Sequence, residues 1–294
     1  MNKLSNIKKN IPKIAKNFLV FLPVIISNLK IDISIIEDLF IGFLIFTFIS
    51  FCVYFTNDFI DKEKDKFNKL KKNSSLSINL NKKDIIFINI FLIIFLLLLS
   101  RTIYFDLVLI GYIVIFYIYT FLKKVKFLDL VCLNSFYIFR LIYGCKLINI
   151  DISLLFIIFF VSVFLILSIF KRIIQINVNN LKEKNNIIAY DKKDLKFLNL
   201  ILLISFLTSS LIFILFIFHN NYLNIEHLLS SSTNLNFNKI SYIMIYLLYL
   251  LNMGKFYNNI LENNIKTDLV EYLFKSKLVL ISCIVILSII AFNK

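Results

Sequence analysis

Long apolar stretches alternate with short charged segments along the whole chain. A membrane-spanning helix needs about 20 mostly apolar residues, and nine stretches approach that length. They are residues 17–35, 38–57, 84–100, 103–122, 127–147, 152–171, 196–218, 237–252 and 273–292. The pattern therefore predicts an all-α integral membrane protein, with about nine transmembrane helices in a single domain over residues 1–294.

The composition supports a membrane protein and argues against two other classes. Of the 294 residues, 59% are hydrophobic and 17% charged, whereas a soluble domain is about 45–50% apolar and about 25% charged. A net charge of +15 is typical of nucleic-acid binders, but such proteins need far more polar surface, so we expect no nucleic-acid partner. Intrinsic disorder is excluded because disordered chains are poor in apolar residues.

The basic residues are divided unequally between the two sides of the predicted membrane. With the N-terminus in the cytoplasm, 27 of the 33 Lys and Arg residues fall on the cytoplasmic side and five on the other. Cytoplasmic loops carry an excess of Lys and Arg, so we expect this orientation, in the cell inner (plasma) membrane. The basic segment 1–16 lacks a small-residue cleavage site and predicts an interfacial N-terminus instead of a removable signal peptide.

Two long charged connections, residues 58–83 and 172–195, lie on the predicted cytoplasmic side. Long loops inside a compact domain are usually functional or disordered. We therefore expect a polar site on this face of the membrane.

The first of these connections begins with three carboxylates, Asp58, Asp61 and Asp65. On a helix they fall within about 60° of one another, where they repel unless a cation joins them. Mg²⁺ is typically held by one or two carboxylates together with substrate phosphates, and Asn57 adds an amide oxygen. The alternative is a solvated helix end, paired with the lysines interspersed among the carboxylates.

Several basic residues have the positions that phosphate groups require. Lys71 and Lys72 follow the carboxylates, and a metal with nearby lysines suits a diphosphate. Arg140 lies inside an apolar span, where a charge usually faces the bundle interior or a cavity. The pair Lys171 and Arg172 ends another span on the cytoplasmic side, where it serves either a phosphate or the orientation of the chain.

The sequence Asn57-Asp58-x-x-Asp61-x-x-x-Asp65 resembles the first signature of the UbiA-type intramembrane prenyltransferase superfamily. Within it, the chain is most similar to the decaprenyl-phosphate phosphoribosyltransferases. The resemblance lies in five stretches, which are residues 16–23, 53–65 and 137–144, the pair Lys171-Arg172, and the closing span. One departure is Gln175, which stands where this branch has an acidic residue.

The resemblance implies a fold, a reaction and a set of ligands. The expected fold has nine helices around a central cavity that opens to the cytoplasmic side. The expected reaction is Mg²⁺-dependent transfer of phosphoribose from 5-phosphoribosyl 1-diphosphate to a polyprenyl phosphate, which releases diphosphate and serves cell-envelope glycolipid synthesis. Asp58, Asp61 and Asp65 would be catalytic and hold the metal. The substrate-binding residues would be Lys16, Asn17, Tyr54, Asn57, Lys71, Lys72, Tyr137, Arg140, Lys171 and Arg172.

Two other functions remain open from the sequence. The first is transfer of a prenyl group from a prenyl diphosphate to an aromatic acceptor, a quinone or haem precursor, with the same metal site. The second is a transporter or channel that uses acidic residues for gating, which predicts flux without a product.

Overall fold

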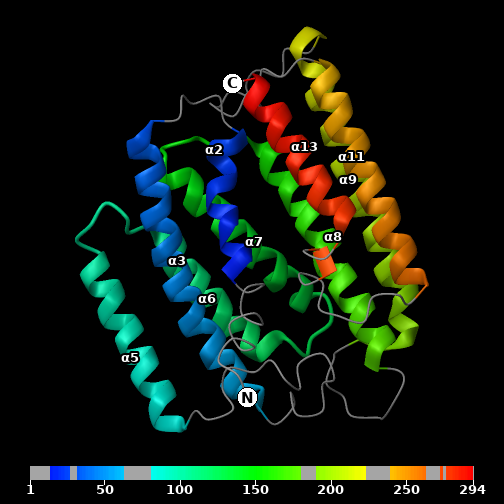
Figure 1. The fold of residues 1–294 in the computed structure, drawn as a ribbon. Helices are drawn as coiled ribbons and strands as arrows, with labels where there is room; N and C mark the ends of the chain where they lie inside the picture. Colours follow the sequence, from blue (N-terminus) through cyan, green and yellow to red (C-terminus); the bar gives the residue numbers. More distant parts are fainter. Residues whose placement is uncertain are drawn as a thin grey trace. The chain divides into compact units, whose positions relative to one another are not determined.

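The computed structural model of the chain is helical throughout the part that it describes (Figure 1). The described residues are 14–26, 32–62, 81–179, 190–222, 239–262, 272–273 and 276–293. Their contacts divide the chain into two compact units. Unit 1 comprises residues 1–23, 31–149 and 182–189, and unit 2 comprises residues 24–30, 150–181 and 190–294.

Unit 1 contains the short 3-10 helix η1 (Lys16–Phe21) and four α-helices. These are α3 (Ile33–Ile60), α5 (Lys82–Leu99), α6 (Leu107–Leu122) and α7 (Leu128–Leu147). Helix α7 packs against both α6 and η1, and α3 contacts all the other elements of the unit. The core between them is mainly aliphatic and aromatic.

Three of the four α-helices of unit 1 begin at polar residues between apolar stretches. Asn81 and Asp84 form a reciprocal capping box at the start of α5, which satisfies two backbone N–H groups that the helix itself cannot bond. The Asp106 side chain accepts a hydrogen bond of 2.8 Å from the Val108 backbone at the start of α6. Asp32, with extended backbone, precedes α3.

The contact between η1 and α7 depends on a glycine. A Cβ atom at Gly144 would overlap the backbone carbonyl oxygen of Val20 and press against Pro23. The missing side chain lets the N-terminal segment lie directly on α7. This close approach places η1 next to Arg140 on α7.

Unit 2 contains α8 (Leu154–Asn179), the short η2 (Lys192–Asp194), α9 (Leu195–Tyr222), α11 (Lys239–Leu261) and α13 (Lys277–Asn293). Helices α8 and α9 form an antiparallel pair, and α11 packs on both of them and on α13. The short α2 (Leu22–Ile26) contains the boundary between the two units.

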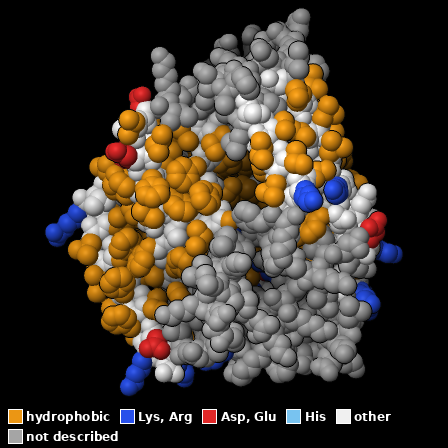
Figure 2. All heavy atoms as spheres, in the orientation of Figure 1, with side chains coloured by type: hydrophobic (Ala, Val, Ile, Leu, Met, Phe, Trp, Pro, Cys, Tyr) orange, Lys and Arg blue, Asp and Glu red, His pale blue; other side chains and the backbone are white. Residues whose placement is uncertain are grey.

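The described helices have the character of a membrane protein. Four of them are long and apolar enough to cross a bilayer, namely α3, α7, residues 154–177 of α8, and residues 192–215 in η2 and α9. Large apolar side chains such as Phe87, Leu98 and Phe121 are mostly exposed. Figure 2 shows hydrophobic side chains over much of the described surface, with few charged ones among them. Such a surface fits lipid better than water.

Each predicted apolar stretch contains a helical segment, but several boundaries differ from the prediction, including that of α11, which continues to Leu261. Helix α3 begins at Ile33, so the last residues of the predicted first span belong to the second. Helix α8 continues to Asn179, so the predicted cytoplasmic connection 172–195 begins as helix. Ile173, Ile174 and Ile176 are buried there, and their packing carries the helix beyond the basic pair.

Candidate functional site

One face of α3 carries a row of polar side chains along a mostly apolar helix. This row, the α3 polar stripe, consists of Thr47, Ser50, Tyr54, Asp58 and Asp61. Steps of three and four residues keep all five on the same face. The stripe runs from the middle of the helix to its C-terminal end, where Asp61 is the C-cap residue.

The two carboxylates at the end of the stripe are buried. Asp58 is 6% exposed and Asp61 8%. Asp61 forms an ion pair with Lys123, the C-cap residue of α6. This ion pair connects the C-terminal ends of α3 and α6. Lys123 therefore belongs to the candidate site, whereas the sequence pattern placed it only among the basic residues of the predicted cytoplasmic side.

Asn57 adds a further oxygen to this end of α3. Its Oδ1 atom is buried and has no hydrogen-bond partner within the described ranges. An unpaired buried carbonyl oxygen costs about 1–3 kcal/mol, which a bound cation or donor would remove. Amide and carboxylate oxygens are the ligands that Mg²⁺ prefers, so Asn57, Asp58 and Asp61 fit the metal that the sequence predicts.

The metal site is incomplete within the described part of the chain. No group of three or more His, Cys, Asp or Glu side chains there could hold a metal ion. Asp65, the third predicted carboxylate, lies outside the described residues, as do Lys71 and Lys72.

Arg140 lies at the centre of a hydrogen-bond network in the interior of unit 1. It is 1% exposed and donates from Nε to Asn17 Oδ1 (2.8 Å). Its Nη2 atom donates to the hydroxyls of Tyr54 and Tyr112, at 3.1 Å each, and Nη1 donates to the Phe136 carbonyl. These neutral partners occupy four of the five N–H donors that a guanidinium has.

Aromatic rings complete the surroundings of this guanidinium. Its Cζ atom lies 5.3 Å from the ring centroid of Phe46 and 5.2 Å from that of Tyr112. Cation–π attraction at such distances helps to offset the cost of burying the charge. Tyr112, on α6, was not identified from the sequence.

Asn17 connects the network to the α3 polar stripe. It is fully buried and donates from Nδ2 to Ser50 (2.9 Å) and Thr47 (3.2 Å), while its carbonyl oxygen accepts from Arg140. Lys16, next to it, is half-buried, and so is Tyr137, one turn before Arg140 on α7.

Three of the five stretches that carry the family resemblance therefore meet in unit 1. Asn17 from residues 16–23 contacts Arg140 from residues 137–144, which contacts Tyr54 from residues 53–65. Asn17 and Arg140 are 123 residues apart along the chain, and Tyr54 and Arg140 are 86 residues apart. The structure brings these residues together as a connected polar cluster.

Lys171 and Arg172 lie on α8, in unit 2. Arg172 is buried and donates to the side-chain oxygen of Gln175, three residues later on the same helix. Gln175, which stands where the family that the sequence resembles has an acidic residue, thus serves as an acceptor for the neighbouring guanidinium.

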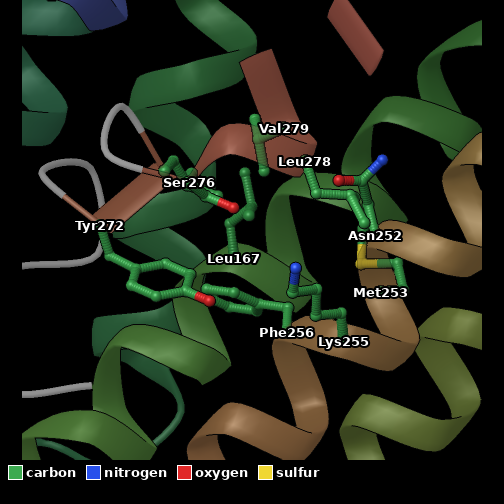
Figure 3. A pocket seen from close by; sticks show the side chains of 10 residues that line it. Leu167, Asn252, Met253, Lys255, Phe256, Tyr272, Ser276, Leu278 and Val279 are labelled. Atoms are coloured by element: carbon green, nitrogen blue, oxygen red, sulfur yellow. The ribbon is translucent and has the colours of Figure 1, made fainter. Parts of the chain in front are cut away.

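Unit 2 also contains a small pocket of about 130 Å³ between α8, α11 and residues 272–279 (Figure 3). Most of its lining is apolar, including Leu167, Phe256 and Val279. Asn252 and Lys255 add polar atoms, and the buried Oδ1 of Asn252 has no partner among the described residues. The pocket is too small for a polyprenyl chain and was not predicted.

Comparisons with protein families and with curated proteins find no match. No family model fits the chain, and no curated protein is significantly similar to it. A proposal for the function therefore rests on the residues and their geometry.

Proposed function

We propose that this protein is a UbiA-type intramembrane transferase that moves phosphoribose from 5-phosphoribosyl 1-diphosphate to a polyprenyl phosphate, with release of diphosphate. The observation that carries the proposal is the α3 polar stripe, which links two buried carboxylates to the cluster around Arg140. Buried polar groups cost stability unless they are hydrogen-bonded or paired with a charge, and a continuous row of them inside an apolar bundle is typical of a functional site.

The proposal includes a topology. Nine helices would surround a central cavity that opens to the cytoplasm, with the N-terminus and the site on that side of the plasma membrane. The four bilayer-length helices and the excess of Lys and Arg on the cytoplasmic side of the predicted topology support it.

Asp58, Asp61 and the Asn57 amide oxygen would hold Mg²⁺, and Asp65 would complete the carboxylate set. When bound, the metal would neutralise the charge that develops on the diphosphate leaving group. Lys71, Lys72, Lys171 and Arg172 would hold phosphates by the same charge complementarity.

The acceptor needs little activation, because a phosphate monoester is already anionic near neutral pH. The main tasks of the protein are then to position the two substrates, to neutralise charge and to exclude water from the ribose carbon that reacts. The four neutral contacts of Arg140 favour a positioning role, in which it fixes Tyr54 and Asn17 beside the stripe.

A substitution at the end of the stripe tests the proposal. In detergent or nanodiscs, Asp61→Asn should lower phosphoribosyl transfer by at least about a hundredfold while the protein remains folded. Asp38→Asn is the matched control, because Asp38 lies near the other end of α3 and accepts a 3.0 Å hydrogen bond from Tyr104. Full activity of Asp61→Asn, or an equal loss in both variants, would contradict the proposal.

A further inference from the structure

The pocket of unit 2 has the size of a site for part of a larger molecule. Its volume is about 130 Å³, and its described walls belong to α8, α11 and residues 272–279. Pockets that hold a whole ligand usually have about 300–1,000 Å³. A molecule that binds here would therefore insert one end and leave the rest outside.

Four polar side chains meet within the apolar walls, namely Asn252, Lys255, Tyr272 and Ser276. Figure 3 shows the Lys255 ammonium and the hydroxyls of Tyr272 and Ser276 pointing into the space between the walls. The Tyr272 hydroxyl accepts a 2.5 Å hydrogen bond from Asn259, so its own proton can still be donated. An ammonium and two hydroxyls together suit an anionic group with several oxygens.

The amide of Asn252 asks for the opposite kind of partner. Its nitrogen donates to the Leu248 carbonyl at 2.7 Å, whereas its buried Oδ1 atom accepts no hydrogen bond from a described residue. Among the described residues, Lys255 has no ion-pair partner, and the lining of the pocket includes no Asp or Glu. The pocket thus fits a ligand that is anionic and that also donates a hydrogen bond.

The pocket lies near basic residues of three helices. Leu167, in its wall, is one turn before Lys171 on α8, Lys255 lies on α11, and Lys277 begins α13. The predicted topology places all three lysines on the cytoplasmic side. Anionic lipids of the cytoplasmic leaflet attract Lys and Arg at this depth, so phospholipid headgroups would lie beside the pocket.

Exposed apolar side chains lead away from the pocket along α11 and α13, which pack on each other. Leu251, one turn before Lys255, is 61% exposed, and Ile281 and Ile284 of α13 are 60% and 67% exposed. Acyl chains that follow these side chains would remain in the apolar part of the bilayer. A lipid can therefore place its headgroup in the pocket without removing its chains from the membrane.

We propose that this pocket binds the headgroup of phosphatidylglycerol, an anionic phospholipid whose phosphate carries a second glycerol. The phosphate accepts hydrogen bonds from Lys255, Tyr272 and Ser276, and a hydroxyl of the glycerol donates to Asn252 Oδ1. An ethanolamine headgroup fits less well, because its ammonium would lie close to that of Lys255 with no acidic side chain among the described lining residues to offset the repulsion. This inference goes beyond the proposed function and does not depend on it.

A comparison of two lipids tests the proposal on the unmodified protein. Phosphatidylglycerol and phosphatidylmethanol with identical acyl chains are titrated into the detergent-solubilised full-length protein, and native mass spectrometry measures the bound fraction. Both lipids are phosphodiesters with the same charge, but phosphatidylmethanol has no hydroxyl to donate. We expect phosphatidylglycerol to bind about fivefold more tightly, the effect of one hydrogen bond.

Two variants assign this binding to the pocket. Asn252→Leu should lower the affinity for phosphatidylglycerol to that for phosphatidylmethanol and leave the latter unchanged within about twofold, which a general loss of structure would not do. Lys255→Met should weaken the binding of both lipids about fivefold. Lys196→Met is the matched control, because Lys196 is an exposed lysine of α9 outside the described lining of the pocket, and it should change either affinity by less than about twofold.

Four results would overturn the proposal. They are equal affinities of the unmodified protein for the two lipids, equal effects of Lys255→Met and Lys196→Met, an unchanged lipid preference in Asn252→Leu, and the absence of bound phosphatidylglycerol. Free glycerol 3-phosphate, added at tenfold excess over the lipid, should not displace it. Displacement would assign the pocket to a soluble phosphate compound and would also contradict the proposal.

Discussion

The two units bury similar polar residues but satisfy them in different ways. In unit 1, Arg140 on α7 donates to Asn17, Tyr54 and Tyr112, which belong to three other elements. In unit 2, Arg172 donates to Gln175 on its own helix. A buried arginine therefore links four elements in one unit, whereas the contact shown in the other is local.

The buried hydroxyl groups show a smaller difference. Ser50 of unit 1 donates to the Thr47 carbonyl of its own helix, as Ser162 and Ser205 of unit 2 donate to carbonyls of theirs, at 2.7 Å each. Ser50 differs in that it also accepts a hydrogen bond from Asn17 on η1. A contact of 2.6 Å between Ser209 and Tyr249 shows that unit 2 also has a bond between helices. Bonds within one helix satisfy polar groups without fixing the arrangement of helices, while bonds between elements hold side chains in a defined geometry. This difference favours unit 1 as the location of the chemistry.

The largest expected effect comes from the two buried arginines. Arg140→Met removes four hydrogen bonds to a charged group and leaves buried acceptors unpaired, so we expect the free energy of unfolding to fall by about 3 kcal/mol. Arg172→Met removes the charged hydrogen bond to Gln175 and should cost about 1.5 kcal/mol. Unfolding in detergent, followed by far-ultraviolet circular dichroism, measures both. Equal losses would remove the distinction between the units.

A smaller effect is expected at the glycines. Gly144→Ala forces Val20 away from α7, which should cost about 2 kcal/mol, as overpacking typically does. Gly254→Ala, on α11, has open space around the added methyl group and should stabilise its helix by about 0.5 kcal/mol. The same unfolding measurement compares them. If Gly144→Ala were neutral, η1 would not be held closely against α7.

The smallest effect is expected at two tyrosines that bond across helices. Tyr112→Phe removes a buried acceptor of Arg140 and should cost about 1.5 kcal/mol, because the partner is charged. Tyr249→Phe removes the contact with Ser209 and should cost about 0.5 kcal/mol. Thermal unfolding of the two variants side by side checks the order, and a reversed order would indicate that the network around Arg140 adds little to stability.

Much of the helical framework could be predicted from the sequence, because long apolar stretches form few structures other than membrane-spanning helices. The shared helix face of Asp58 and Asp61 and the inward orientation of Arg140 could also be predicted. Helical spacing places Asp58 and Asp61 on one face, and a charge within an apolar span has to face the protein interior.

The partners of these residues could not be predicted. Lys123 and Tyr112 lie 62 and 28 residues from the side chains that they contact, and spacing along the chain carries no information on such pairs. The structure surrounds Arg140 with neutral oxygens and aromatic rings, which its position in an apolar span did not specify. Helix α8 continues beyond Arg172 because the three isoleucines that follow are buried. The charged pair Lys171 and Arg172 before them led to the prediction that the span ends there.

The most direct test of the proposed function is an exchange of donors. Purified protein with Mg²⁺ and polyprenyl phosphate is incubated with 5-phosphoribosyl 1-diphosphate, and in parallel a prenyl diphosphate is supplied with an aromatic acceptor. The lipid products are then analysed by mass spectrometry. We expect phosphoribosylated polyprenyl phosphate from the first mixture, and its loss in Asp61→Asn. A prenylated aromatic product without phosphoribosylated lipid would contradict the proposal, and so would the absence of any product.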